Sequence, residues 1–283
     1  MEIHLIEPIG FCFGVTRALD LLRSINKDSK INLLGMIVHN EEVLSSLKKG
    51  NIDIIDERKT DLKEALTNIN DNETVVFSAH GHPTIFEDIA RNKNLTQIDA
   101  TCPLVALNLT LGQKYALEGL IYIGDKSHLE AASFLYNCPA SFFFDISSFS
   151  FIKKPAMPIR HVISQTTLST LEVKKAFEYI KKTYPEAKLE KSVCNATKAR
   201  QEAIMKLEND YDAIIIIGSS YSSNSRKLYS LAKAKCQNSF LVLNKSELSS
   251  IPSLHEYKKI ALGSGTSTSL KTINECLDYL GSL

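Results

Sequence analysis

Three cysteines occur in similar local settings and could together bind one metal centre. They stand in the segments Gly10-Phe-Cys12-Phe-Gly-Val, Asp99-Ala-Thr-Cys102-Pro-Leu-Val and Ser192-Val-Cys194-Asn-Ala-Thr, about 90 residues apart. Each cysteine follows a short segment expected to be extended and precedes apolar residues at helical spacing. Three converging thiolates suit a soft metal centre, either zinc or an iron–sulfur cluster.

The spacing of these cysteines favours the cluster over zinc. Structural zinc sites usually contain local C-x₂-C pairs, and this sequence has none. A [4Fe–4S] cluster normally takes four cysteines, so three would leave one iron open to a substrate oxygen. We therefore predict one [4Fe–4S] cluster per chain, which could also appear as [3Fe–4S]. The remaining cysteines fall outside the repeat and are interpreted as packing residues or free thiols: Cys138, Cys236 and Cys276.

Two polar clusters follow each cysteine, and an apolar, strand-like run leads into each polar cluster. The first clusters are His39-Asn40, His128-Leu-Glu130 and Ser222-Ser-Asn224. The second clusters are Ser78-Ala-His80-Gly81, Gln165-Thr166-Thr167 and Gly263-Ser-Gly-Thr-Ser267. Because the order of cysteine, polar cluster and polar cluster occurs three times, the sequence indicates a threefold internal repeat.

The polar clusters contain the residue types that hold an anion. Histidines donate hydrogen bonds and add positive charge when protonated, and serine and asparagine donors beside glycines and helix starts commonly hold phosphate. The predicted substrate-binding residues are His39, His80, His128, Thr166, Ser222, Ser223, Asn224 and Ser267. Several hydroxyls lie between Gly263 and Ser269, so the choice of Ser267 stays open by one or two positions.

Glu130 is the one carboxylate among these clusters and the candidate acid. Enclosure and a neighbouring anion both disfavour the charged form of a carboxyl group, so this group can keep a proton near neutral pH. Thr166 could orient the substrate or relay that proton. We predict both residues to be catalytic.

The elements that must position these residues are those of an α/β fold. Strand-like runs alternate with helical stretches, which predicts βαβ units and parallel sheets, and ligands bind at the carboxyl ends of such strands. We expect three similar modules, residues 1–97, 98–193 and 194–283, around a pseudo-threefold axis and a central cluster. The N-terminal strand is expected to close another module.

Composition excludes several functional classes. The chain has 283 residues, 44% of them hydrophobic and 23% charged, with a net charge of +1. This charge predicts neither a nucleic-acid partner nor an anionic-membrane surface, and no apolar run approaches the roughly 20 residues of a membrane span. Six cysteines are too few for a disulfide scaffold, and no signal peptide is evident, so we expect a cytoplasmic protein with reduced thiols. We expect it to be a monomer.

The sequence contains no complete nucleotide-cofactor motif, so we expect the electrons to come from another protein. The sequence has no P-loop, and Gly263-Ser-Gly265 lacks the third glycine of the dinucleotide fingerprint.

The sequence resembles the 4-hydroxy-3-methylbut-2-enyl diphosphate reductases (the LytB or IspH family). The resemblance runs from residue 10 to about residue 270. It rests on Gly10-Phe-Cys-Phe-Gly-Val15, Val38-His-Asn40, Ser78-Ala-His-Gly81, Asp99-Ala-Thr-Cys-Pro-Leu-Val105, Gln165-Thr-Thr167, Arg200-Gln-Glu-Ala203 and Ser222-Ser-Asn-Ser225. Residues 125–127 differ from the pattern associated with some members.

The resemblance implies the last step of the non-mevalonate isoprenoid pathway, the reductive removal of an allylic hydroxyl that gives isopentenyl and dimethylallyl diphosphates. It implies that Cys12, Cys102 and Cys194 hold the cluster, that Glu130 supplies a proton and that Thr166 lies near the substrate hydroxyl. It implies that the diphosphate is held by His39, His80, His128, Ser222, Ser223, Asn224 and Ser267. The electron donor would be an external protein such as ferredoxin or flavodoxin.

Three other functions remain to be distinguished. A cluster-dependent dehydratase would also use an open iron but would consume no electrons. A phosphometabolite-binding protein with structural zinc would be colourless. An iron–sulfur sensor would carry a basic DNA-binding element, and none is evident.

Overall fold

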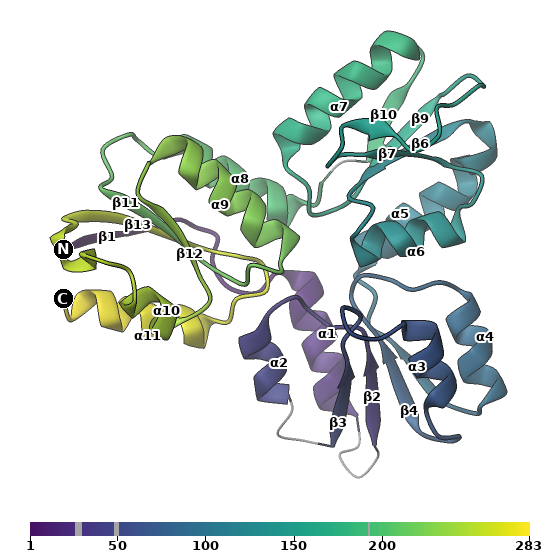
Figure 1. Cartoon of the computed structure of the whole chain (residues 1–283), viewed down its shortest axis with the longest axis horizontal. Helices are drawn as coiled ribbons and strands as arrows, with labels where there is room; N and C mark the ends of the chain where they lie inside the picture. The colour runs from purple at the N-terminus through teal and green to yellow at the C-terminus, as the bar shows by residue number, and fades with distance from the viewer. Residues whose placement is uncertain (26–29, 48–50, 192) are drawn as a thin grey trace. The chain divides into compact units, whose positions relative to one another are not determined.

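The computed structural model describes residues 1–25, 30–47, 51–191 and 193–283, which form three β-sheets covered by helices (Figure 1). The chain divides into two compact units. The first unit comprises Met1–Val15, Val38–Ser46 and Asn195–Leu283, and the second comprises Thr16–Ile37 and Leu47–Cys194. Among the described residues, no helix combines the length and the apolar character that crossing a membrane requires.

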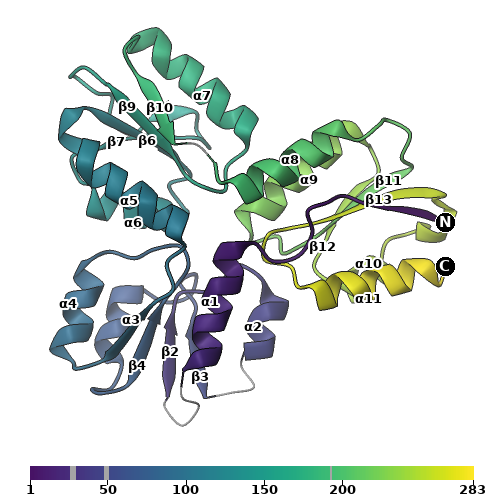
Figure 2. The same cartoon turned by 180° about the vertical axis from the view of Figure 1, so that it is seen from behind.

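The first sheet belongs to the second unit and is entirely parallel, in the order β3-β2-β4-β5. Its strands are β2 (Ile31–Leu34), β3 (Ile52–Ile55), β4 (Thr74–Phe77) and β5 (Thr96–Asp99). One face packs through Leu66, Phe86 and Ala90 against α3 (Leu62–Asn68) and α4 (Ile85–Asn92). Residues 16–24 of α1 (Phe13–Ser24) lie across the opposite face (Figure 2). A short helix, α2 (Glu41–Leu47), connects β2 to β3.

The second sheet has the order β10-β9-β6-β7-β8 and lies in the same unit. Its strands are β6 (Leu120–Gly124), β7 (Phe142–Asp145), β8 (Ser150–Phe151), β9 (His161–Ser164) and β10 (Lys188–Lys191). Phe134 of α6 (Leu129–Asn137) and Leu109 of α5 (Pro103–Tyr115) pack on one face, and the 3-10 turn η1 (Ala116–Glu118) follows α5. Val173 and Ile180 of α7 (Thr170–Thr183) pack on the other face.

The strand β8 departs from the expected parallel arrangement, because it pairs antiparallel with β7. The turn between them is held by Asp145, whose Oδ2 accepts hydrogen bonds from the backbone N–H of Ser148 at 3.2 Å and from its hydroxyl at 2.7 Å. Phe149 completes the turn with a φ of 50°. A connection this short can join only antiparallel strands.

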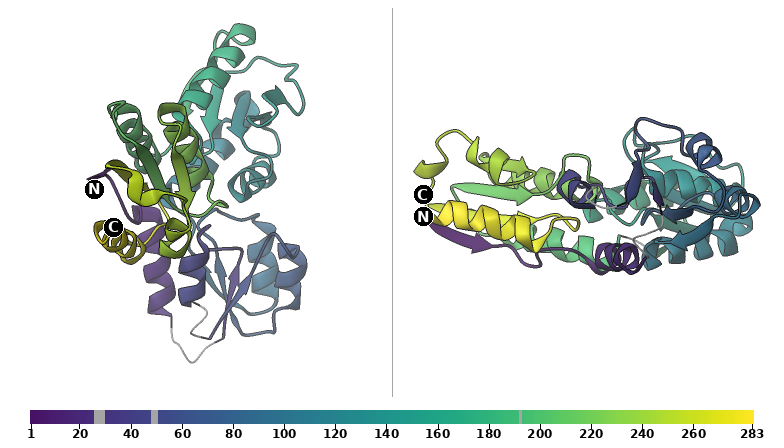
Figure 3. Two further views of the ribbon diagram at one scale, coloured as in Figure 1. Left: turned by 60° about the vertical axis from the view of Figure 1, so that its left-hand side comes forward. Right: turned by 90° about the horizontal axis from the view of Figure 1, so that it is seen from below.

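The third sheet belongs to the first unit and has the order β1-β13-β11-β12, again all parallel. Its strands are β1 (Glu2–Leu5), β11 (Ala213–Ile217), β12 (Ser239–Val242) and β13 (Lys259–Ser264). The helices α8 (Asn195–Lys206) and α9 (Ser223–Lys235) pack on one face, and α10 (Lys245–Ser249) and α11 (Leu270–Gly281) pack on the other. The 3-10 turn η2 (Leu254–Glu256) precedes β13, and the two chain termini lie side by side (Figure 3).

The three sheets share a plan that positions the polar residues. In each sheet, one edge strand leads into a cysteine: β1 leads to Cys12, β5 to Cys102 and β10 to Cys194. The two central parallel strands of each sheet lead toward the polar clusters, which follow them at the edge where ligands bind in open α/β sheets. The prediction of an α/β fold with parallel sheets is confirmed.

Two strand ends differ from the sequence prediction. The apolar run before His39-Asn40 indicates a strand that reaches Val38, but β2 ends at Leu34 because Gly35 has a φ of +80° and turns the chain. The apolar run before Gly263 indicates a strand that ends at Leu262, but β13 continues through Gly263 and Ser264.

Candidate functional site

The three predicted cluster ligands have the same local structure. All three cysteines are half-buried thiols that form no disulfide, and each immediately precedes a helix: Cys12 precedes α1, Cys102 precedes α5 and Cys194 precedes α8. Their backbone N–H groups each donate a hydrogen bond of 3.0 Å to a carbonyl. The acceptors are Thr266, Ala79 and Thr166, in that order. Each acceptor stands two residues after the end of a central strand, namely β13, β4 or β9.

These three thiols fit an iron–sulfur cluster by their chemistry. Sulfur donors are the ligands that such clusters take, and the positive end of a helix favours a negatively charged ligand set. Ser192, which opens the third cysteine segment, lies outside the described residues. The repeated backbone setting gives Cys12, Cys102 and Cys194 equivalent local environments.

The other cysteines have different surroundings. Burial raises the pKa of Cys138 and of Cys276 to about 11, so both thiols stay protonated at neutral pH. The Sγ of Cys236 points to the carbonyls of Tyr211 and Asp212, each at 3.6 Å. These surroundings agree with the interpretation as packing residues or free thiols.

Glu130 is enclosed and held from several sides. It lies in the first turn of α6 and is 2% exposed. Its Oε1 accepts the backbone N–H of Thr166 at 2.8 Å, and its Oε2 accepts the Thr166 hydroxyl at 2.8 Å. The Tyr122 hydroxyl, from β6, donates to Oε1 at 3.3 Å. Two residues that the sequence placed in separate polar clusters are therefore in direct contact.

Burial sets the protonation of Glu130. Loss of solvation raises the pKa of this carboxyl from 4.5 to about 7, although the hydrogen bonds from Thr166 and Tyr122 oppose the change. Burial also raises the pKa of Tyr122 well above its ordinary value, so its hydroxyl keeps its proton and remains a donor. Glu130 can therefore hold a proton near pH 7 and release it, as a general acid must.

His80 and His128 lie next to each other in the second unit. Their ring centroids are 5.5 Å apart and the ring planes are nearly perpendicular, at 80°. His128 caps α6, because its Nδ1 accepts the backbone N–H of Glu130 at 3.2 Å. With Nδ1 as an acceptor, the ring hydrogen is on Nε2, which is then a hydrogen-bond donor.

His39 lies in the first unit, next to Asn40, whose side chain holds the local backbone. The Oδ1 of Asn40 accepts the backbone N–H of Glu42 at 3.0 Å and that of Val43 at 3.2 Å, which caps the start of α2. Asn40 therefore fixes the backbone next to His39.

The serine and asparagine cluster begins α9 in the first unit. Ser222 is its N-cap, and its Oγ accepts the N–H of Ser225 at 3.3 Å. Ser223 and Asn224 form the first turn and are buried. Both polar atoms of the Asn224 amide are buried without a hydrogen-bond partner among the described residues. A buried amide in this state, at a helix N-terminus, is suited to an anionic ligand.

The hydroxyls between positions 264 and 269 differ in whether they already form hydrogen bonds within the protein. The Oγ of Ser264 accepts the N–H of Gly10 at 3.0 Å, Thr268 donates to the Ile217 carbonyl at 2.8 Å, and Ser269 caps α11. Ser267 is 4% exposed, and its Oγ has no partner within the part of the chain that the structure describes. This hydroxyl is therefore available to a ligand, whereas those of Ser264, Thr268 and Ser269 stabilise the fold.

The predicted site residues divide between the two units. The first unit contains Cys12, His39, Ser222, Ser223, Asn224 and Ser267, and the second contains Cys102, Cys194, His80, His128, Glu130 and Thr166. In the second unit, Thr166 joins Glu130 to Cys194, and His128 contacts both His80 and Glu130.

Sequence reasoning missed residues that support this site. Tyr122 lies in the middle of a strand and reads as an ordinary core residue. Arg17 and Arg200 each lie on the helix that follows a cysteine. Each donates a hydrogen bond to a backbone carbonyl shortly before another cysteine, Arg17 to Thr101 at 3.1 Å and Arg200 to Gly10 at 2.7 Å. An arginine at a similar distance after two of the three cysteines was the available signal.

Comparison with known proteins identifies relatives over the whole chain. The family model described as LytB protein matches residues 3–281. A 4-hydroxy-3-methylbut-2-enyl diphosphate reductase of Lysinibacillus sphaericus is 31% identical, over 99% of this chain and 88% of the relative. The reductase of the same name from Wolbachia sp. subsp. Brugia malayi is 32% identical, over 99% of this chain and 91% of the relative.

Solved structures show the same fold. The structure of E-1-hydroxy-2-methyl-but-2-enyl-4-diphosphate reductase from Plasmodium falciparum superposes with a TM-score of 0.84 at 29% identity, over all of this chain and 87% of that one. A structure of (E)-4-hydroxy-3-methyl-but-2-enyl diphosphate reductase, described as the terminal enzyme of the non-mevalonate pathway, gives a TM-score of 0.66 at 26% identity, with both chains fully covered. Together with the match over residues 3–281, these likenesses show that the chain belongs to the LytB family.

Proposed function

We propose that this protein is a 4-hydroxy-3-methylbut-2-enyl diphosphate reductase, which converts its substrate to isopentenyl and dimethylallyl diphosphates in the last step of the non-mevalonate pathway. Relatives that bear this name match 99% of the chain. The observation that carries the proposal is the threefold repetition of one local structure, a half-buried cysteine at a helix start whose N–H binds the carbonyl beyond a central strand.

Cys12, Cys102 and Cys194 would hold one [4Fe–4S] cluster, with one iron that has no cysteine ligand and that could be lost to give [3Fe–4S]. Their equivalent settings and the buried, protonated state of Cys138 and Cys276 support this ligand set. When bound, the cluster would supply electrons and a Lewis-acidic iron for the substrate oxygen.

The diphosphate would be bound by His39, His80, His128, Ser222, Ser223, Asn224 and Ser267. The Nε2–H of His128 and the N-terminus of α9 are donors of the kind that bind phosphate oxygens. The Asn224 amide and the Ser267 hydroxyl are buried without a partner among the described residues, and a bound anion would satisfy both.

Glu130 would supply the proton that converts the leaving hydroxyl to water, and Thr166 would orient the group beside it. The pKa of about 7 keeps a substantial fraction of Glu130 protonated at neutral pH. The overall reaction consumes two electrons and two protons, breaks the allylic C–O bond, forms a C–H bond and releases water. Delivery of the second proton to either end of the allyl group gives the two products.

The electrons would come from an external protein such as ferredoxin or flavodoxin. We further propose that the protein acts in the cytoplasm as a monomer, without nucleic-acid or membrane partners. Residues 1–97, 98–193 and 194–283 would form its three modules.

The experiment is product analysis with anaerobically purified protein, the substrate and a chemical reductant. The proposal predicts both five-carbon diphosphates with reductant and neither without it. Conversion that is independent of reductant would instead indicate a dehydratase, and an unchanged substrate in both samples would contradict the proposal.

A further inference from the structure

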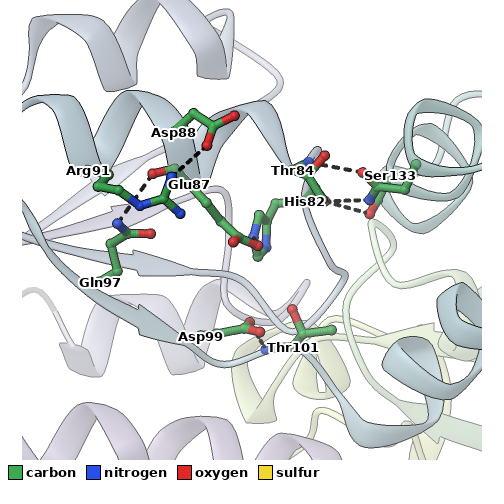
Figure 4. A network of polar contacts seen from close by, with 10 residues as sticks. His82, Thr84, Glu87, Asp88, Arg91, Gln97, Asp99, Thr101 and Ser133 are labelled. Carbon is green, nitrogen blue, oxygen red and sulfur yellow. Dashed lines mark hydrogen bonds and ion pairs between the residues drawn. The ribbon is translucent and has the colours of Figure 1, made fainter.

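The loop that carries His80 is bonded to the helix that carries Glu130. The loop runs from the end of β4 to the start of α4, and the carbonyl of His82 accepts two side-chain hydrogen bonds from α6. Ser133 Oγ donates to it at 3.1 Å and Asn137 Nδ2 at 2.9 Å. Asn137 Oδ1 also accepts the backbone N–H of Thr84 at 3.0 Å. Figure 4 shows His82 facing Ser133 across one of these bonds.

The His82 side chain fixes the same loop on its other side. Its ring stacks on Phe77, the last residue of β4, with the centroids 3.9 Å apart and the planes at 19°. Its Nε2 lies 3.2 Å from Oε1 of Glu87 in the first turn of α4. The ring therefore binds the loop to the first sheet, while the backbone binds it to α6.

Both ends of this connection reach predicted substrate-binding residues. His80 stands two residues before His82, and Gly81 between them has a φ of +81°. His128 caps α6 and Glu130 lies in its first turn, on the helix face that one turn later carries Ser133 and then Asn137. Because a helix of nine residues is stiff, the bonds at its far end set where its first turn lies against the loop.

We propose that Asn137 is a positioning residue: through its two bonds to the His82–Thr84 backbone, it holds His80 at the separation from His128 that diphosphate binding needs. This inference rests on the proposed function and deepens it. Both hydrogen bonds of Asn137 go to the backbone of the loop, so it acts through the loop. A hydrogen-bond donor moved by about 1 Å loses much of its contribution to an anionic ligand, and such shifts are known to cost up to about 100-fold in rate.

The test uses the cluster-loaded protein and inorganic pyrophosphate as the probe. Asn137→Ala removes both bonds. Asn137→Asp keeps the acceptor for Thr84 but replaces the donor that faces the His82 carbonyl with an oxygen. Ser133→Ala removes the second donor to that carbonyl. Asn238→Ala is the matched control, because Asn238 likewise donates its amide to a backbone carbonyl, that of Asp212 at 3.1 Å, in the other unit.

We expect Asn137→Ala and Asn137→Asp to weaken pyrophosphate binding by roughly 10-fold and to raise KM by a similar factor, with kcat changed less and iron content unchanged. Ser133→Ala should have a smaller effect in the same direction, and Asn238→Ala none. Asn137 variants that bind pyrophosphate within about twofold of the wild type would overturn the positioning role. A wild-type protein that binds no pyrophosphate would overturn the proposed diphosphate site itself, and the role of Asn137 with it.

Discussion

Thr166 donates a hydrogen bond to each carboxylate oxygen of Glu130, one from its backbone N–H and one from its hydroxyl, both at 2.8 Å. The carbonyl of the same residue accepts the N–H of Cys194 at 3.0 Å. One residue therefore connects the candidate acid with a candidate cluster ligand. This connection fixes the carboxyl in space, and both of its hydrogen bonds favour the charged form of Glu130.

Replacing Glu130 by glutamine should abolish turnover without disturbing the cluster. Glutamine preserves the size of the side chain and an oxygen acceptor for the Thr166 N–H, but it has no proton to give. We expect kcat to fall by roughly 100-fold or more, as for the loss of a general acid, with iron and sulfide content at the wild-type level. A Glu130→Gln variant with a rate near that of the wild type would show that another group supplies the proton.

The activity should depend on pH through Glu130. Because the acid must be protonated, and its pKa is about 7, kcat should fall as the pH rises above 7. Removing the Thr166 hydroxyl by Thr166→Val takes away a bond that stabilises the charged carboxylate, so this alkaline limb should move to higher pH. Thr166→Ser, which keeps the hydroxyl, should restore it. A profile that is the same in all three proteins would contradict the assignment.

The same pKa predicts how stability changes with pH. The pKa of Glu130 in the folded protein is above its ordinary value of 4.5, so the folded state retains a proton that the unfolded chain has already released between these values. This contribution to stability is therefore complete below pH 4.5 and is lost as the pH rises through about 7. Between pH 5.5 and pH 8, we expect the free energy of unfolding to fall by about 2 kcal/mol more in the wild type than in Glu130→Gln. Denaturant unfolding of both proteins under anaerobic conditions at the two pH values measures the difference, and equal losses would contradict the shift.

Asn224 should matter for ligand binding rather than for folding. Its buried amide has no partner among the described residues, so Asn224→Ala breaks no hydrogen bond that the structure shows. The unfolding free energy should stay the same or rise, while KM should increase about 10-fold or more, as expected for a lost hydrogen bond to a charged ligand. The control is Asp61→Ala. Asp61 caps α3 by accepting the backbone N–H of Glu64, so its loss should cost about 1 kcal/mol of stability and leave KM unchanged.

Much of this site could be predicted from sequence because its residues follow short apolar strands. Polar residues follow the apolar strands that end at Phe77, Gly124, Ser164 and Ile217. Parallel sheets place such positions at one edge, the carboxyl ends of the strands. The direct contact of Glu130 with Thr166 was also within reach, because the two follow adjacent strands, β6 and β9.

The remaining features depend on tertiary contacts that leave no local pattern. Tyr122 has the hydrophobic neighbours of any buried strand, and only the fold shows that its hydroxyl reaches Glu130. Asn137 lies at the end of a helix, where a polar residue is ordinary, and its partners are more than 50 residues away in the chain. The end of β2 was predicted wrongly because Met36, Ile37 and Val38 continue the apolar run after Gly35 has already turned the chain.

The central claim is that Cys12, Cys102 and Cys194 hold an iron–sulfur cluster, and metal analysis tests it most directly. Iron, sulfide and zinc would be measured, with a visible spectrum, on anaerobically purified wild type and on the Cys→Ser variants at these positions, with Cys236→Ser as the control. We predict about four irons and four sulfides per chain with broad brown absorbance, lost in each of the three variants and kept in the control. One zinc without sulfide in the wild type, or a full cluster in any of the three variants, would contradict it.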